Sequence, residues 1–226
     1  MLKNPVDFSQ IKAVLYDFDG TLLDSNELIA ESWRHTVKSL AGREISDDEI
    51  RSSLGEMLAD SMRRLVPEAD PDTARDFYRE YQREIFLDRI SLFDGTKETL
   101  NALKEAGYKN ALATSRLKTS TFRALDWFGI TDCFDTILTA NDTDKFKPDP
   151  TPIFMVLDTL GCRPEEAIFI GDTVHDIEAG AAAGVFTLLV DWSFALPPGP
   201  VRDNAPAPDG VLKRMQDIPE LLGVKK

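Results

Sequence analysis

Cysteine is scarce in this chain, with only Cys133 and Cys162 among 226 residues. Two distant cysteines offer neither a disulfide framework nor a metal-type spacing, so we expect two reduced thiols in a reducing compartment. Long apolar runs are also missing, since no stretch approaches the roughly 18 residues that a membrane-spanning helix needs. The first residues lack the apolar run of a signal peptide. These absences predict a soluble, cytoplasmic protein.

Positive charge is in short supply as well. The chain has 26 Lys and Arg against 39 Asp and Glu, which gives a formal net charge of −13. An acidic surface argues against nucleic acid or an anionic membrane as the main partner. Local cations would have to attract any phosphorylated substrate. The hydrophobic content of 42% is enough for a core and a sizeable inserted domain.

An acidic pair follows the first apolar run of the chain. Residues 13–16 read as a buried strand, and Asp17 and Asp19 come directly after it. Gly20 lets the chain turn sharply because it has no Cβ. Two carboxylates this close repel each other unless a cation lies nearby, and Mg²⁺ binds such pairs together with water and phosphate oxygens. The stretch therefore predicts either a Mg²⁺ site or an acid/base pair with separated roles.

The next part of the chain reads as helical throughout, from about residue 26 to residue 87. Asp24 and Glu27 have the spacing of a capping box, which predicts a helix that begins just beyond. Ser46 and Glu49 have the same spacing at a second helix start. Because no strand pattern interrupts this region, we expect an all-helical cap domain over residues 25–91, inserted into a core domain made of residues 1–24 and 92–226.

The remainder alternates short apolar strands with helices of about ten residues. This alternation predicts βαβ units, and hence an α/β fold with a doubly wound parallel sheet and helices on both faces. Asp94-Gly95-Thr96 repeats three letters of the first loop without the preceding acid, so we expect only a turn there, with Asp94 or Thr96 capping the next helix. The expected strands are 110–114, 134–138, 166–170 and 185–190, the expected helices are 97–106, 119–128, 151–160 and 176–183, the proline-rich loop is 197–208, and a final segment at 212–222 packs on the domain.

Ligands of such sheets bind outside the carboxyl ends of the strands, so the residues there are the candidates for a site. Thr114 and Ser115 follow the second strand, where a hydroxyl beside turning amides can bind phosphate oxygens. Lys147 precedes a proline and is therefore held extended. Its ammonium could offset the two acids and contact a phosphate, with Lys145 as a second candidate.

A second acidic edge follows the fourth strand. Asp172 could reach a metal directly, whereas Asp176 is suited to bind a metal-bound water or to pair with Lys147. His175, beside this edge, and His35, in the helical insert, are expected to have packing or surface roles, with a substrate contact as the alternative for His35.

These stretches resemble, in order, the four motifs of the haloacid dehalogenase-like (HAD) hydrolases. Residues 17–21 read Asp-x-Asp-Gly-Thr, as in motif I, and residues 171–176 read Gly-Asp-Thr-x-x-Asp, as in motif IV. Thr114 and the Lys147–proline pair stand where motifs II and III are expected. The resemblance runs from about residue 12 to residue 222. It implies a Rossmann-like core, and the insert is similar to the first cap type of the family.

The resemblance also implies roles. Asp17 would be the nucleophile that forms an aspartyl phosphate, and Asp19 would act first as general acid and then as general base. The cofactor would be Mg²⁺, held by the Asp17 carboxylate, the Asp19 backbone carbonyl and Asp172, with Asp176 behind them. The groups implied for binding the transferred phosphoryl group are the side chains of Thr114 and Lys147 and the backbone amide of Ser115.

Several substrates remain open. Asp19 favours phosphoester or phosphoanhydride hydrolysis, because halide-releasing and phosphonate-cleaving relatives lack an acid there. The layout is similar to that of phosphoglycolate phosphatases, which makes such a small phosphorylated metabolite the first expectation. Residues 25–29, His35-Thr36 and the stretch 171–176 with its His175 are also similar to a branch of inorganic pyrophosphatases. Phosphosugar mutases are a further alternative, although their motif I usually reads Gly-Val.

Two alternatives are not enzymes. A receiver-like switch also carries a phosphorylated aspartate, a Thr and a Lys on a similar sheet. Such a module is typically little more than half as long as this chain and has no counterpart of Asp19. A catalytically inactive relative is the other possibility, but every expected catalytic position is filled here.

Overall fold

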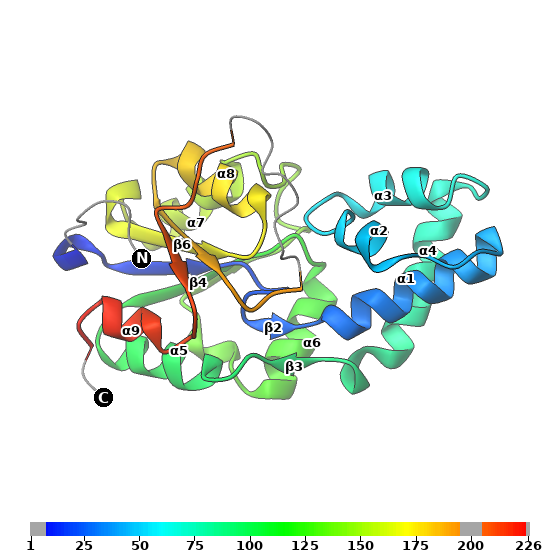
Figure 1. Ribbon diagram of the computed structural model, residues 1–226. Coiled ribbons are helices and arrows are strands. Elements are labelled where there is room, and N and C mark those ends of the chain that lie inside the picture. Colours follow the sequence, from blue (N-terminus) through cyan, green and yellow to red (C-terminus); the bar gives the residue numbers. More distant parts are fainter. Residues whose placement is uncertain (1–7, 195–204, 225–226) are drawn as a thin grey trace. The chain divides into compact units, whose positions relative to one another are not determined.

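A computed structural model of the protein describes residues 8–194 and 205–224, which form two compact units. One unit is Asp24–Ser91, and the other combines the described residues before and after it (Figure 1). The chain passes between the units at two short paired strands, β2 (Leu23–Asp24) and β3 (Ser91–Leu92). Among the described residues, no helix is both long and apolar enough to cross a membrane.

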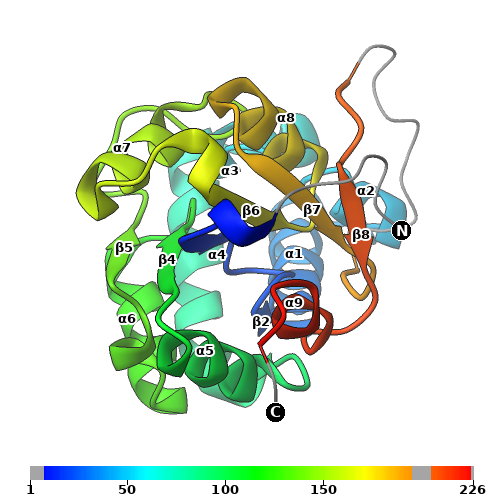
Figure 2. The same ribbon diagram turned by 90° about the vertical axis from the view of Figure 1, so that its left-hand side faces the viewer.

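The larger unit is built on a six-stranded parallel sheet, which confirms the predicted α/β fold. Figure 2 shows helices α5, α6 and α9 on one face and α7 and α8 on the other. The strand order is β5-β4-β1-β6-β7-β8, so β1 lies at the centre and is completely buried. The strands are β1 (Ala13–Tyr16), β4 (Lys109–Ala113), β5 (Thr136–Leu138), β6 (Ala167–Gly171), β7 (Phe186–Val190) and β8 (Gly210–Leu212).

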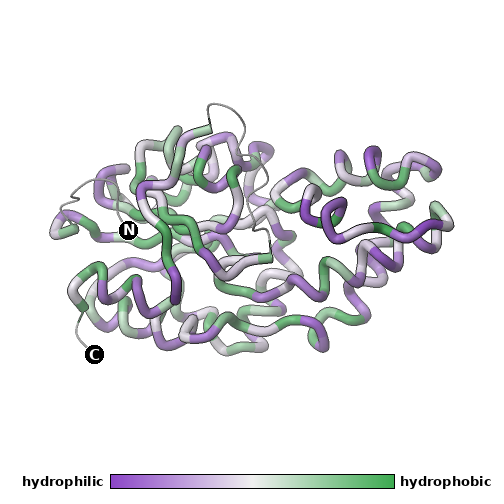
Figure 3. Tube along the Cα trace, viewed as in Figure 1, coloured by the Kyte–Doolittle hydropathy of each residue, from purple (hydrophilic) through white to green (hydrophobic). Residues whose placement is uncertain are grey.

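Burial on both faces explains why the central strands read as continuous apolar runs. Figure 3 shows this hydrophobic character along the middle of the sheet. Strand β8 was missed by the sequence reading, because its three residues lie between the loop expected at 197–208 and the start of the segment 212–222 that we expected only to pack on the domain. The surface loop predicted at 197–208 lies largely outside the described residues.

The helices of this unit match the predicted ones closely, but one predicted cap is wrong. Gly95, with φ at 82°, is the N-cap of α5, and no side chain caps that helix. The Thr96 hydroxyl donates instead to the Leu22 carbonyl, at 3.4 Å. The helices are α5 (Thr96–Glu105), α6 (Lys118–Phe128), α7 (Thr151–Leu160), α8 (Val174–Ala183) and α9 (Asp217–Leu221), with short 3₁₀ turns η1 (Phe8–Gln10), η3 (Thr131–Cys133) and η4 (Pro164–Glu166).

All the regular secondary structure between residues 26 and 88 is helical, as predicted for residues 26 to 87. The capping box of α2 is confirmed, because the Glu49 amide donates to Ser46 Oγ and the Ser46 amide donates to Glu49 Oε2. The capping box predicted at Asp24 is wrong. Ser25 is the N-cap of α1, and Asp24 Oδ1 accepts a hydrogen bond from the Asn26 amide, at 3.2 Å. The helices are α1 (Asn26–Ala41), α2 (Asp47–Arg51), α3 (Leu58–Leu65) and α4 (Pro71–Ile85), followed by η2 (Phe86–Asp88).

Aromatic contacts between α1 and α4 hold this unit together. The Trp33 and Tyr78 rings lie 5.1 Å apart in its interior. The His35 ring stacks on Tyr81, with the centroids 3.8 Å apart, and on Phe77, at 5.2 Å. These contacts fit the packing role that we expected for His35.

Candidate active site

Three of the predicted motif loops leave the sheet side by side. Tyr16, the last residue of β1, is in register with Leu112 of β4 and Ile170 of β6. The Asp17 amide extends this ladder by donating to the Ile170 carbonyl, at 2.9 Å. Because the strands are parallel, the residues that follow them emerge at one edge of the sheet. Those residues include Asp17, Asp19, Thr114 and Asp172.

The turn after Asp17 requires a glycine at position 20. Gly20 has φ at 76°, and its amide donates to the Leu23 carbonyl, at 2.9 Å. A Cβ built there would lie 2.0 Å from Asp172 Oδ2, so the backbone approaches that carboxylate closely. Both the backbone conformation and the lack of space therefore select glycine.

Lys147 lies between two carboxylates at this edge. Its Nζ is 2.8 Å from Asp17 Oδ1 and 2.6 Å from Asp176 Oδ1. Burial lowers the pKa of Lys147, but the two carboxylates outweigh burial and raise it overall, so the ammonium stays charged. Lys145, the alternative candidate, has a side chain that is 64% exposed and lies 3.9 Å from Asp149. The structure thus brings Lys147, and not Lys145, to Asp17.

Asp176 is fully engaged with protein groups. While Oδ1 binds Lys147, Oδ2 accepts hydrogen bonds from the Thr173 amide, at 3.0 Å, and from the Thr173 hydroxyl, at 2.7 Å. Burial raises the pKa of Asp176, but Lys147 and the Thr173 hydrogen bonds outweigh burial and lower it overall. Asp176 is therefore an ionised group that fixes the position of Lys147, one of the two roles considered for it from the sequence.

The carboxylates of Asp17, Asp172 and Asp176 each offer an oxygen atom within 4.8 Å of the others. Asp172 Oδ2 accepts a hydrogen bond from Ser193, at 2.6 Å. Its Oδ1 is buried and has no hydrogen-bond partner in the described part of the chain. An unpartnered buried carboxylate oxygen next to further carboxylates is the environment that a divalent cation stabilises.

The raised pKa values of two of these acids also indicate a site that a cation would stabilise. Burial raises the pKa of Asp17 to about 7, assisted by the charges of Asp176 and Asp19 and opposed by Lys147. Burial and the neighbouring carboxylates also raise the pKa of Asp172 well above its ordinary value. A bound cation would favour the ionised form of both acids. The donor set, all carboxylate oxygen, fits Mg²⁺.

Asp19 has a partner that the sequence reading did not assign. The Asp19 carboxylate accepts two hydrogen bonds from Arg116, one from Nε at 2.9 Å and one from Nη2 at 2.7 Å. The Arg116 amide in turn donates to Thr114 Oγ1, at 3.1 Å. Thr114 is buried, whereas Ser115, between them, is exposed. The sequence signal was available, since Arg116 also follows the end of β4.

Ser193 was missed for a different reason. It follows β7, and that strand end was not inspected for polar groups although the same rule applies to it. Its neighbour Trp192 donates from Nε1 to the Thr21 carbonyl, at 3.1 Å, which attaches this loop to the turn after Asp17.

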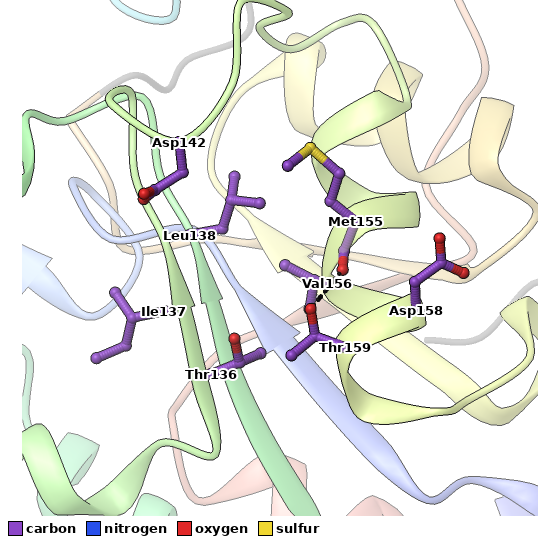
Figure 4. Close-up of a pocket in the computed structure, with 8 residues that line it drawn as sticks. All are labelled: Thr136, Ile137, Leu138, Asp142, Met155, Val156, Asp158 and Thr159. Carbon is purple, nitrogen blue, oxygen red and sulfur yellow. Dashed lines mark hydrogen bonds between the residues drawn. The ribbon is translucent and has the colours of Figure 1, made fainter.

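A separate hollow is lined by β5, α7 and the loop between them (Figure 4). Its ionisable lining groups are the carboxylates of Asp142 and Asp158, and it has no cationic side chain. The Asp142 carboxylate already accepts hydrogen bonds from the amide and hydroxyl of Thr139. Because a phosphate site needs cations or free donors, we place the candidate site at the strand ends instead.

Comparison with known proteins identifies the family of the chain. Residues 14–190 match the family model of the haloacid dehalogenase-like hydrolases, and the chain therefore belongs to this family. Its class is that of the HAD phosphatases.

Two relatives and one solved structure are similar to the chain over most of its length. The chain is 34% identical over 216 residues to pyrophosphatase PpaX of Bacillus velezensis, covering 96% of this chain and 98% of the relative. It is 35% identical over 210 residues to PpaX of Listeria monocytogenes serotype 4a, covering 92% and 95%. A predicted phosphoglycolate phosphatase from Haemophilus somnus, a crystal structure, matches with a TM-score of 0.80 at 24% identity, covering 94% of this chain and 98% of the other. An identity this low shows the fold alone.

Proposed function

We propose that this protein is a Mg²⁺-dependent phosphatase that hydrolyses inorganic pyrophosphate in the cytoplasm through a phosphorylated Asp17. The observation that carries the proposal is the buried group of Asp17, Lys147 and Asp172, in which a nucleophile, a cation and an unpartnered carboxylate oxygen lie together. The pyrophosphatase names of the relatives support pyrophosphate as the substrate.

The reaction has two steps. An oxygen of the Asp17 carboxylate attacks one phosphorus, the bond from that phosphorus to the bridging oxygen breaks, and the electron pair leaves with the bridging oxygen on the departing phosphate. Asp19 gives this oxygen a proton. Water then attacks the phosphorus of the aspartyl phosphate and passes a proton to Asp19, which releases the second phosphate and restores Asp17.

Other residues of the site serve positioning roles. Lys147, held by Asp176, neutralises part of the charge of Asp17 and of the incoming phosphate. Thr114 and the Ser115 amide would bind oxygens of the transferred group. Mg²⁺, held by the Asp17 and Asp172 carboxylates and the Asp19 carbonyl, would stabilise the negative charge that develops during transfer.

Phosphoglycolate, our first expectation from the sequence, is the second candidate substrate. The phosphoglycolate phosphatase neighbour shares the fold, and phosphoglycolate resembles pyrophosphate in having a negatively charged leaving group. The Arg116 guanidinium beside Asp19 is a specific feature that suits either anion.

The test is release of inorganic phosphate, with Mg²⁺, from pyrophosphate, phosphoglycolate, sugar phosphates and nucleoside monophosphates. We expect the highest kcat/KM with pyrophosphate and loss of activity with a chelator. A clear preference for phosphoglycolate would select the second candidate. A preference for a sugar phosphate would overturn both.

A further inference from the structure

We propose that Arg116 reads the leaving group of the substrate. Its guanidinium would bind a second anionic group, a phosphate or a carboxylate, on the far side of the bond that is cleaved. The proposal rests on the proposed function of the same site, because it takes Asp17 as the group that attacks phosphorus.

The first argument is the position of the Arg116 guanidinium. Both Asp19 oxygens accept from its guanidinium, at 2.9 and 2.7 Å. A general acid must lie within hydrogen-bond reach of the oxygen that it protonates, and for Asp19 that oxygen belongs to the leaving group. A guanidinium paired with the same carboxylate therefore lies beside the position that the leaving group would take.

The second argument is how Arg116 is held. Its amide donates to Thr114 Oγ1, at 3.1 Å, and its carbonyl accepts from the Ala140 amide, at 3.0 Å. Both the amide and the carbonyl of Arg116 are thus hydrogen-bonded, which fixes its backbone next to Thr114, the residue implied in phosphoryl binding. The side chain is only 7% exposed, so the guanidinium reaches Asp19 along a restricted path. A group that is positioned in advance loses less entropy when it binds a ligand.

The third argument is the division of charge between two cations. Lys147 is committed to Asp17 and Asp176, whose side chains are 12% and 1% exposed. Arg116 pairs with Asp19, whose side chain is 27% exposed and so is more accessible than those two carboxylates. An entering anion can compete for the guanidinium there, and the planar fork that now binds a carboxylate presents the same two N–H groups to a phosphate.

This arrangement links specificity to catalysis. When a second anion takes over the guanidinium, the Asp19 oxygens lose those two hydrogen bonds and can turn to the leaving oxygen. A substrate with a neutral leaving group cannot make this exchange, so the arginine would leave Asp19 paired. Arg116 itself transfers no proton and forms no covalent bond.

The test compares the wild-type protein with Arg116→Gln on three substrates: pyrophosphate, phosphoglycolate and phenyl phosphate, whose leaving group has no charged substituent. We expect Arg116→Gln to lower kcat/KM for the anionic leaving groups by about 10- to 100-fold, the effect of losing a charge-assisted pair. We expect no such loss for phenyl phosphate, whose kcat/KM should stay unchanged or rise, because the variant releases Asp19 from the guanidinium. Arg116→Lys, which keeps the charge without the fork, should fall between. Whichever of pyrophosphate and phosphoglycolate shows the larger loss of kcat/KM carries the anionic group that Arg116 binds.

Binding supplies a readout that does not depend on turnover. Calorimetry with imidodiphosphate, a pyrophosphate analogue with a nitrogen bridge, should show weaker binding by Arg116→Gln, while binding of inorganic phosphate changes little. Arg123→Gln, which removes an exposed cation from α6, is the matched control, and circular dichroism shows whether each variant is folded.

The outcomes separate the two proposals. An equal loss on all three substrates, or no loss, with wild-type pyrophosphatase activity intact, would overturn the role of Arg116 and leave the proposed function standing. A wild-type protein that prefers phenyl phosphate would overturn the proposed function. In that case equal weakening of imidodiphosphate and phosphate binding would overturn the role of Arg116 as well.

Discussion

Lys147 and Asp17 form a buried ion pair, with 2.8 Å between Nζ and Oδ1. The pair joins the residue after the central strand β1 to the loop that follows the edge strand β5. Burial disfavours both charges. The carboxylates of Asp17 and Asp176 outweigh burial at Lys147 and raise its pKa, whereas Lys147 only partly offsets burial at Asp17, whose pKa is raised to about 7. The candidate nucleophile therefore has a charged partner in Lys147 and is itself one of the three clustered carboxylates.

Lys147→Met should therefore impair activity strongly. The variant leaves the buried carboxylates of Asp17 and Asp176 without their cation, and we expect kcat/KM for pyrophosphate to fall by at least about 100-fold. Lys145→Met is the matched control, because that side chain is exposed two residues away, and it should change kcat/KM by less than about twofold. Steady-state phosphate release measures kcat/KM for both variants. Equal effects of the two would contradict the placement of Lys147, and not Lys145, beside Asp17.

Asp172→Asn should weaken metal binding. The amide replaces the carboxylate whose Oδ1 has no hydrogen-bond partner among the described residues, so we expect Mg²⁺ affinity to drop by roughly 10- to 100-fold. Calorimetric titration with Mg²⁺ measures the change. Asp158→Asn, an exposed acid on α7, is the control and should bind Mg²⁺ like the wild type. Unaltered affinity in Asp172→Asn would exclude this carboxylate as a ligand.

Stabilisation by Mg²⁺ should depend on pH. The pKa of Asp17 is raised from 3.8 to about 7, so the metal-free folded state holds a proton that the unfolded chain has lost. Between these values the contribution of Asp17 to the free energy of unfolding decreases as pH rises. Mg²⁺ competes with that proton and binds more tightly as pH rises through about 7.

Thermal melting measures this dependence. The increase in Tm caused by Mg²⁺ should be larger at pH about 8 than at pH about 5.5. Asp17→Asn should reduce the difference, and the raised pKa of Asp172 accounts for what is left. An increase that is the same at both pH values in the wild-type protein would show that no proton competes with the metal.

Gly20→Ala should cost both stability and activity. Any Ala at a positive φ costs about 1–2 kcal/mol, and at Gly20 the added Cβ also meets Asp172 Oδ2. Gly42→Ala is the matched control, because Gly42 has φ at 67° and nothing within 4 Å of the added Cβ. Chemical denaturation should show a larger loss for Gly20→Ala, and only that variant should lose activity, by at least about tenfold. If Gly42→Ala were as damaging, the close approach to Asp172 would be unimportant.

The fold was largely predictable because the sequence is regular at the level of strands and helices. Buried parallel strands read as apolar runs, and the predicted helix at 151–160 coincides with α7. Strand β8 was not predictable in this way, since three residues carry too little pattern. The cap expected at Asp24 failed because its side chain accepts from the Asn26 amide, two residues on. The cap expected at Thr96 failed because its hydroxyl donates to the Leu22 carbonyl, a partner that only the folded chain brings near.

The candidate site was predictable where a motif specifies position. The strand-end rule and the family resemblance selected Asp17, Asp172 and Lys147, which the structure brings together, although their roles remain predictions. The partners Arg116 and Ser193 follow strand ends too, but their contacts depend on side-chain paths that no local pattern encodes. Sequence order alone did not show that Arg116 would reach Asp19.

The most direct test of the account is phosphate release from pyrophosphate, with Mg²⁺, by the wild-type protein and by Asp17→Asn. The account predicts efficient hydrolysis by the wild type and a loss of at least about 1,000-fold in the variant, because the attacking carboxylate is gone. Hydrolysis that persists in Asp17→Asn at a rate near that of the wild type would contradict the phosphorylated Asp17 on which the whole account depends.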